Sequence, residues 1–137
     1  MTFSRDIKIR FQHCDPAGIV FYPRYFEMFN QMVEDWFSDA IGLSFQKMHT
    51  EQRIGVPLVH SEADFLKASR IGDILTFTLS VAEIGRRSFK LQIEALSGEE
   101  VRIKALLVLA CVSLGDTLKG TDVPDLLRRS MEPFLAD

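Results

Sequence analysis

The chain opens with an alternating pattern of side chains and then changes to a helical one. Residues 3–11 alternate apolar and polar side chains, with Ile7 and Ile9 on the apolar side, which is the period of a half-buried strand. A long helix is predicted to begin near Pro23, because the missing proline N–H would have no partner in the first turn of a helix. Gly42 is its predicted end. The apolar side chains of this helix recur at steps of three and four residues: Tyr25, Phe26, Phe29, Met32, Val33, Trp36, Phe37 and Ala40.

Most of the second half of the chain is predicted to be sheet. Four strands are expected, over residues 56–68, 74–84, 87–96 and 101–114. Their short linkers make consecutive strands antiparallel neighbours. Before them, Ser44 is expected to cap a short helix, and after them residues 123–134 favour a closing helix. A strand, a long helix and then a run of strands is an α+β layout in which the helix covers the sheet.

One stretch of this predicted sheet points to assembly. Residues 105–112 are apolar on both faces of the strand they would form. Such a strand is expected to be covered on both sides, or on one side by a partner subunit.

Composition and charge narrow the class of protein. The 137 residues fit a single domain spanning 1–137, and 47% of them are hydrophobic, with 11 Phe, enough for a real core. The net charge of -3, without a basic tail, argues against a nucleic-acid partner. The longest apolar run is too short to cross a bilayer, and the N-terminus lacks the apolar stretch of a secretory signal, so we expect a cytoplasmic protein with no membrane partner. Cys14 and Cys111 lack a metal-ligand spacing, and no metal is expected.

The run HCDPAGIVFYP, residues 13–23, places a carboxylate at the mouth of the predicted helix. The start of a helix offers unpaired N–H groups and partial positive charge, which can hold a carbonyl oxygen that is becoming an oxyanion. Asp15, next to it, would attack that carbonyl or aim water at it. From spacing alone, an Asp before a Pro is equally a residue that begins a turn.

This run resembles the signature of the 4-hydroxybenzoyl-CoA thioesterase family, in its Asp-type branch. The resemblance extends from Ile7 to about Pro124 and implies a hotdog fold, in which a curved antiparallel sheet wraps around a long central helix. It also implies an acyl-CoA thioesterase with Asp15 as nucleophile or general base and the backbone N–H of Tyr22 as oxyanion donor. The substrate would carry an aromatic acyl group like 4-hydroxybenzoyl, or a short or medium acyl chain. Coenzyme A would be part of that substrate, and no separate cofactor is implied.

Other matching segments suggest where the substrate binds. The turn Gly85-Arg86-Arg87-Ser88-Phe89 is similar to a basic turn that the family places over the phosphates of coenzyme A, although Gly85 stands where the type member has another basic residue. The resemblance therefore assigns Arg86, Arg87 and Ser88 to substrate binding; from the residues alone, the turn is equally a solvated hairpin tip. His60 follows a stretch that resembles the strand lining the family's acyl pocket, and is a further candidate for substrate contact.

Several alternatives stay open at this point. Glu27 and Glu34 on the predicted helix compete with Asp15, since related hotdog thioesterases use a helix carboxylate. Two functions other than thioester hydrolysis also stay open. The chain would then be a hotdog hydratase or dehydratase acting on acyl thioesters, or a non-catalytic binding module for acyl-CoA or an acyl carrier. Family membership further implies a homodimer whose sheets join, with the active site between subunits, and commonly a homotetramer built from two such dimers.

Overall fold

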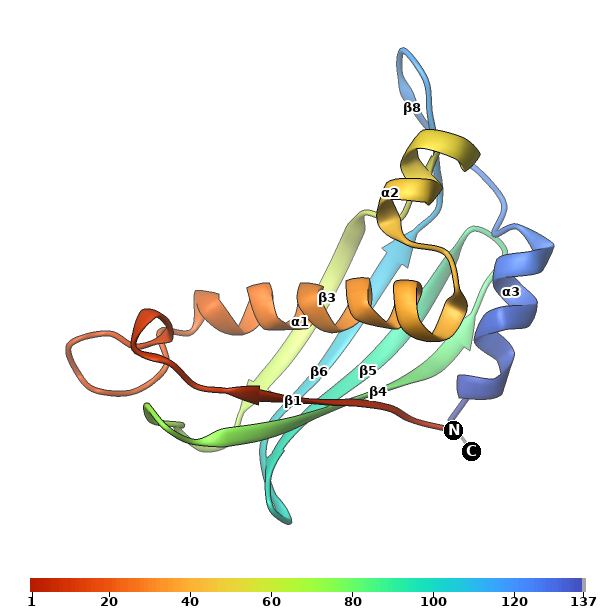
Figure 1. Ribbon diagram of the computed structural model, residues 1–137. Coiled ribbons are helices and arrows are strands. Elements are labelled where there is room, and N and C mark those ends of the chain that lie inside the picture. Colours follow the sequence, from red (N-terminus) through yellow and green to blue (C-terminus); the bar gives the residue numbers. More distant parts are fainter. Residues whose placement is uncertain (137) are drawn as a thin grey trace.

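The computed structural model describes residues 1–136 and has a curved sheet that wraps around one long helix (Figure 1). The main sheet has five strands in the order β1-β4-β5-β6-β3, and every neighbouring pair is antiparallel. The strands are β1 (Phe3–Lys8), β4 (Ile74–Ile84), β5 (Ser88–Ser97), β6 (Glu100–Ala110) and β3 (Leu58–Phe65). A second, three-stranded sheet is formed by β2 (Ile54–Gly55), β7 (Val112–Leu114) and β8 (Leu118–Gly120). The predicted α+β architecture is confirmed.

The long helix begins and ends where the sequence predicts. Helix α1 (Pro23–Trp36) starts at the proline and continues as a π-helical segment over Phe37–Ile41. It stops at Gly42, whose φ of +83° is a left-handed conformation that glycine adopts without strain. The other helical segments are short: Phe11–His13, α2 (Phe45–Lys47), Met48–Gln52, α3 (Asp125–Met131) and Glu132–Phe134.

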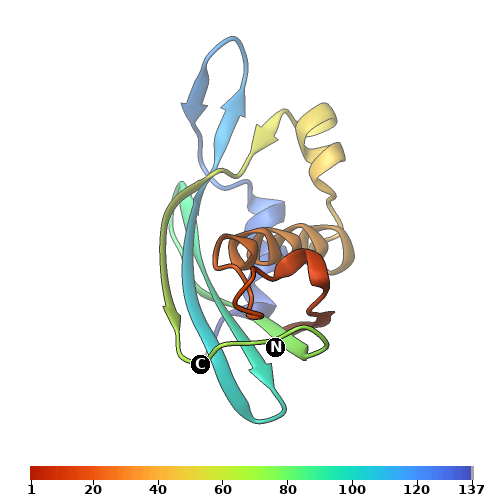
Figure 2. The same cartoon turned by 90° about the vertical axis from the view of Figure 1, so that its left-hand side faces the viewer.

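The core lies between α1 and the concave face of the sheet. Figure 2 shows the helix seated inside the curve of the strands. Side chains along the strands alternate between this face and the outer one, so that every second residue is buried. Burying one large apolar side chain stabilises the fold by roughly 1.5–3 kcal/mol. The buried residues on α1 are Tyr25, Met28, Phe29, Met32, Val33 and Trp36.

Strand β3 forms one edge of the main sheet. β3 pairs with β6 on one side and is last in the strand order on the other. Three of its apolar side chains are strongly exposed: Leu58 (50%), Val59 (59%) and Phe65 (45%). An exposed apolar edge strand offers unpaired N–H and C=O groups to another strand.

Three predicted strands end at least three residues before their predicted limits. The first strand ends at Lys8. The Ile9 N–H still donates to the facing Asp73 O at 2.7 Å, but the Asp73 N–H donates to Arg70 O at 3.0 Å and does not return the bond. The last predicted strand is divided at Cys111, where the pairing partners change. The Cys111 N–H still donates to the facing Arg87 O at 2.8 Å, in register with the β5–β6 ladder, whereas Val112 pairs with β2 and β8. β3 stops at Phe65, since the next N–H groups turn to the carbonyl of Arg102. No helix within residues 1–136 is both long enough and apolar enough to span a membrane.

Candidate active site

Asp15 lies in a tight turn that uses one of its two carboxylate oxygens. The Ala17 N–H donates to Asp15 Oδ1 at 2.8 Å, and the Gly18 N–H donates to the carbonyl of Asp15 at 2.9 Å. Gly18 has a φ of +81°, which a residue with a side chain adopts only with strain. Asp15 Oδ2 takes part in no hydrogen bond among residues 1–136, and the residue is half-buried. One oxygen is therefore fixed by the turn and the other is free for a reacting group.

The chain on either side of this turn forms a small hairpin at the start of α1. Residues 13–15 run antiparallel to residues 19–21, with Asp15 N–H donating to Ile19 O at 3.1 Å and Phe21 N–H donating to His13 O at 2.9 Å. The hairpin is attached to the segment before β4 by a hydrogen bond from Val20 N–H to Ser69 O at 2.9 Å. The carboxylate and the helix start are thus held in one compact unit.

Tyr22 supplies an open N–H at the mouth of α1. Its φ and ψ of -53° and -34° are already helical. The N–H groups of Arg24 and Tyr25 donate to the carbonyls of Phe21 and Tyr22, and Pro23 has no N–H to donate. The Tyr22 N–H makes no hydrogen bond within the described part of the chain. It lies at the positive end of a 14-residue helix, where it is suited to bind an oxyanion.

His13, beside the turn, is held as a neutral imidazole. Its Nδ1 accepts a hydrogen bond from the Arg10 N–H at 2.8 Å. Burial lowers the pKa of His13, and the charges of Arg24 and Arg10 lower it further. Its ring therefore acts as a structural hydrogen-bond partner for residues 10–13.

The buried Cys111 lacks the features of a nucleophile. Burial raises the pKa of the Cys111 thiol to about 11, so the thiol remains protonated at neutral pH. Cys14 lies in the hairpin in a bridge with Val20. Among residues 1–136, no three His, Cys, Asp or Glu side chains gather closely enough to hold a metal ion.

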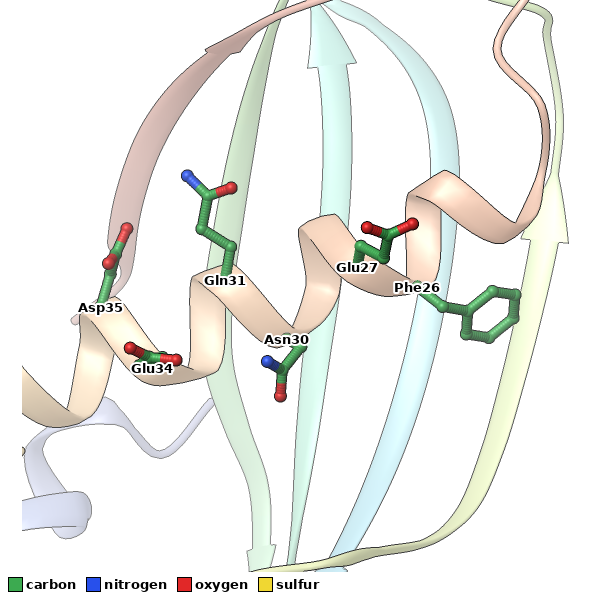
Figure 3. Close-up of a pocket in the computed structure, with 6 residues that line it drawn as sticks. All are labelled: Phe26, Glu27, Asn30, Gln31, Glu34 and Asp35. Atoms are coloured by element: carbon green, nitrogen blue, oxygen red, sulfur yellow. The ribbon is translucent and has the colours of Figure 1, made fainter. Parts of the chain in front are cut away.

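The rival carboxylates on α1 lie along an open face of the helix. Figure 3 shows Glu27 and Glu34 among the residues that line an open pocket of about 610 Å³, together with Asn30, Gln31 and Asp35. Glu27 is paired with Arg24 at 2.7 Å. At a rise of 1.5 Å per residue, Glu34 is roughly 18 Å along the helix axis from Tyr22 and Glu27 roughly 7 Å. Only Glu27 is close to the helix start, and its charge is already compensated.

A second, apolar pocket opens beside α1 on the side of β3. Its volume is about 180 Å³, and Asn30 is the one polar residue that lines it. Phe26 points toward β3 in Figure 3 and packs against Phe65 with ring centroids 6.4 Å apart. Phe26 lies one helical turn from Tyr22, so the pocket begins near the open N–H. The apolar lining comes from Phe26, Phe29 and Val33 of α1, Leu58 of β3, Leu107 and Leu109 of β6, and Phe45, Val56 and Pro57.

The arginine turn between β4 and β5 carries two exposed guanidinium groups. Arg86 and Arg87 both approach Asp122 Oδ1, at 3.2 and 3.1 Å, and their side chains are 77% and 58% exposed. The hydrogen bond from Arg87, with the nearby charge of Arg86, lowers the pKa of Asp122. Arg128 Nη2 donates to Gly85 O at 2.6 Å and braces the turn from α3. Asp122 and Arg128 belong to no motif, and only the fold brings them to this turn.

The two main parts of the predicted site do not meet in one protomer. The Asp15 hairpin is attached just before β4, at Arg70, and the arginine turn follows the end of β4. The eleven residues of β4 span roughly 35 Å at 3.3 Å each. Figure 1 shows the two regions at opposite ends of the sheet.

Ser88 and His60 also lie away from the Asp15 hairpin. Residues paired directly in an antiparallel sheet share a face. His60 pairs with Val108 and Ser88 with Ala110, on the outer face of the sheet, away from α1. His60 Nε2 lies 3.1 Å from Glu62 Oε1. Asp15 and Tyr22 thus belong to one hairpin and the helix start that follows it, whereas His60, Ser88 and the arginines lie elsewhere in the fold.

Comparison with known proteins identifies the family. A model of the thioesterase-like superfamily matches residues 9–131. A 1,4-dihydroxy-2-naphthoyl-CoA hydrolase from Nostoc punctiforme is 26% identical over 132 residues, which are 96% of this chain and 88% of that protein. A 4-hydroxybenzoyl-CoA thioesterase from Pseudomonas sp. strain CBS-3 is 32% identical over 84 residues, which are 60% of this chain and 59% of that one.

A solved structure agrees with these relatives. The structure of 4-hydroxybenzoyl-CoA thioesterase from Pseudomonas sp. strain CBS-3 superposes with a TM-score of 0.86 at 26% identity, over 94% of this chain and 98% of that one. The sheet wrapped around α1 is therefore a hotdog fold. With its family model and its relatives in agreement, the chain belongs to the thioesterase-like superfamily and is a thioester hydrolase.

Proposed function

We propose that this protein is an acyl-CoA thioesterase of the Asp-type branch, with Asp15 as its catalytic carboxylate and the Tyr22 N–H as its oxyanion donor. One observation carries this proposal: a carboxylate with a free oxygen and an open helix N–H belong to the same hairpin. The Asp15 carboxylate attacks the thioester carbonyl or takes a proton from the attacking water. The Tyr22 N–H binds the oxygen that becomes negative.

A site with so few catalytic groups is suited to a thioester substrate. Thiolate is a good leaving group, so this reaction needs less help from a general acid than hydrolysis of an amide. One carboxylate and one oxyanion donor then provide the main stabilisation of the transition state, and losing a single such donor costs other enzymes roughly a hundredfold in rate or more. The proposed reaction needs no cofactor beyond the coenzyme A of the substrate.

The apolar pocket beside α1 is the proposed acyl site. It begins one turn from the oxyanion donor and is lined by aromatic and aliphatic side chains. Two relatives are named for 1,4-dihydroxy-2-naphthoyl-CoA and 4-hydroxybenzoyl-CoA, which both carry an aromatic acyl group. We therefore infer an aromatic acyl-CoA as the substrate class, with short and medium acyl chains as the comparison set in a substrate panel.

The coenzyme A phosphates are assigned to Arg86 and Arg87, with Ser88 beside them. Guanidinium groups bind phosphate through paired hydrogen bonds. The span of roughly 35 Å along β4 is longer than the pantetheine arm that joins a thioester to those phosphates. A second copy of the chain, joined through β3, would reverse the strand direction and bring its own arginine turn to the end where Asp15 lies.

The central test replaces the carboxylate and its rivals one at a time. Asp15→Asn is expected to lower kcat for thiol release from an aromatic acyl-CoA about 10²- to 10⁴-fold, the range for a positioned acid–base group, while the substrate still binds. Glu27→Gln and Glu34→Gln are the matched controls and are expected to keep kcat within about threefold. The measurements are thiol release with a chromogenic disulfide and substrate binding by calorimetry.

Four outcomes would contradict the proposal. Turnover of Asp15→Asn close to that of the unaltered protein would remove Asp15 from the reaction, and a large loss in Glu27→Gln would transfer the role to the helix. Hydration of a double bond without thiol release would indicate a hydratase instead. Substrate binding with no turnover in the unaltered protein would indicate a binding module.

A further inference from the structure

Arg102 is a cation largely removed from solvent, and its side chain converges on one loop. It lies near the start of β6 with its side chain 15% exposed. Its Nη1 donates to Ala68 O and Ser69 Oγ, both at 2.9 Å, and to Asp73 Oδ2 at 3.3 Å. Its Nε donates to Glu100 Oε1 at 2.6 Å. The guanidinium thus holds together both ends of residues 68–73, the segment that leads into β4.

This segment is the platform on which the Asp15 hairpin rests. Ser69 is buried, with 1% of its surface exposed, and its carbonyl accepts the hydrogen bond from Val20 N–H at 2.9 Å. The next residue, Arg70, forms the bridge with Ile19, and its N–H donates to Asp73 Oδ2 at 2.9 Å. Arg102 therefore contacts the platform on one side, while the hairpin is attached to it on the other.

The same polar cluster reaches the first turn of α1. The Tyr25 hydroxyl is buried close to Ser69 but makes no hydrogen bond of good geometry within the described residues. Burial raises the pKa of Tyr25, and Ser69 and Arg102 oppose that shift only in part. Side chains from β6, the 68–73 segment and α1 thus meet behind the hairpin.

We propose that Arg102 is a positioning residue for thioester cleavage, acting through Ser69 and Val20 on the Asp15 carboxylate and the Tyr22 N–H. Val20 lies two residues before Tyr22 and five after Asp15, so the Ser69–Val20 hydrogen bond sets the position of both. Misplacing a catalytic group by 1 Å costs enzymes roughly a hundredfold in rate. This inference rests on the proposed function, because it takes Asp15 and Tyr22 as the reacting groups.

Lysine cannot replace arginine in this role. Arginine presents five N–H donors in a planar fork, whereas lysine offers a single ammonium on a flexible stem. The Arg102 guanidinium serves the 68–73 segment through one nitrogen and Glu100 through another. Arg102→Lys keeps the charge but loses this geometry.

The test is Arg102→Lys, with Lys104→Arg as the matched control. Lys104 is exposed on the same strand, two residues further on. Lys104→Arg therefore makes the reverse exchange between the same two residue types, at a position away from the platform. Arg102→Lys is expected to lower kcat, per folded protein, about 10- to 100-fold with KM for acyl-CoA within about twofold. Amide exchange of the Val20 N–H, followed by NMR, is expected to become faster relative to amides in the middle of β5. Lys104→Arg should leave all three quantities unchanged.

A second variant covers the case in which Arg102→Lys does not fold. Ser69→Ala removes the Oγ acceptor and leaves the carbonyl that binds Val20. It is expected to lower kcat about three- to tenfold at constant KM, which is roughly 1 kcal/mol for one hydrogen bond. If either folded variant loses thermal stability but keeps its kcat and its rate of Val20 amide exchange, Arg102 has only a structural role and the inference is wrong.

Asp15→Asn in the same assay separates the two proposals. Loss of turnover in Asp15→Asn, together with unchanged kcat in Arg102→Lys and Ser69→Ala, overturns the positioning role and leaves the proposed function intact. Full turnover in Asp15→Asn overturns both.

Discussion

At the scale of single residues, the proposed chemistry depends on how the Asp15 turn is held. The turn closes through hydrogen bonds from Ala17 N–H and Gly18 N–H, and Gly18 adopts a left-handed φ of +81°. A Cβ added at Gly18 would lie 3.7 Å from the guanidinium of Arg70, which is ordinary contact, so conformation rather than space requires glycine there. A substitution therefore strains the turn itself, next to the carboxylate.

We predict that Gly18→Ala impairs the reaction more than it impairs folding. Holding alanine at this left-handed φ is expected to cost about 1–2 kcal/mol of folding free energy, and any relaxation of the turn moves the Asp15 carboxylate. The kcat for thiol release should fall about tenfold or more. Thermal or chemical denaturation gives the stability, and kcat is normalised to the folded fraction.

Gly98→Ala is the matched control for this prediction. Gly98 also has a positive φ, of +62°, and open space around the added Cβ, but it lies in the hairpin between β5 and β6. It should show a similar loss of stability with kcat unchanged. An equal fall of kcat in both variants would mean that the loss follows stability and not the geometry of the Asp15 turn.

At the scale of elements, local sequence patterns were enough to predict the long helix and the middle of the sheet. The proline that starts α1 and the glycine that ends its π-helical continuation act through their own backbones. The predicted strand 74–84 coincides with β4, whose alternation of buried and half-buried side chains runs from Leu75 to Val81. The same local reasoning found Ser44, which accepts from Lys47 N–H at 3.2 Å as the cap of α2. These features require no knowledge of distant contacts.

Elements that depend on distant partners could not be predicted in this way. Residues 101–114 look like one continuous strand, yet the structure divides them at Cys111, because the residues after it pair with β2 and β8 instead of β3 and β5. β2 has two residues and β8 three, too short for a periodic signal.

In the candidate site, the run at 13–23 predicted Asp15 and Tyr22, whereas the platform under the hairpin has no local pattern. Arg102 reaches it from a strand that lies more than thirty positions further along the chain.

The arginine turn is the element whose binding role is most directly testable. We predict that Arg86→Ala combined with Arg87→Ala raises KM for the full acyl-CoA about 10- to 100-fold, since a hydrogen bond to a charged group contributes roughly 1.5–3 kcal/mol. The KM for the matching pantetheine thioester, which lacks the nucleotide phosphates, should change by less than about twofold. Steady-state kinetics on both substrates measures the difference. Equal changes in the two KM values would show that the turn is only a solvated hairpin tip.

At the scale of the whole molecule, the two parts of the proposed site lie at opposite ends of the sheet in one chain. The Asp15 hairpin and the arginine turn are separated by the length of β4, and the sheet ends in the exposed apolar strand β3. Pairing of two β3 strands about a two-fold axis would satisfy that edge and place the Asp15 hairpin of one chain and the arginine turn of the other at the same end of the joined sheet. This arrangement is the proposed homodimer, and two such dimers would form the proposed homotetramer.

We predict that Val59→Lys blocks this assembly without unfolding the protomer. Val59 is 59% exposed on β3, so lysine costs the isolated chain little, but a lysine on an edge strand opposes pairing of that edge with another strand. Light scattering after size exclusion should give the mass of the monomer, and thiol release from acyl-CoA should fall at least about tenfold because each remaining site lacks one half. Leu126→Lys, at a 71% exposed apolar position on α3, is the control and should keep both mass and turnover. A Val59→Lys protein with the unaltered mass would exclude β3 as the joining edge, and a fully active monomer would show that one protomer contains the entire site.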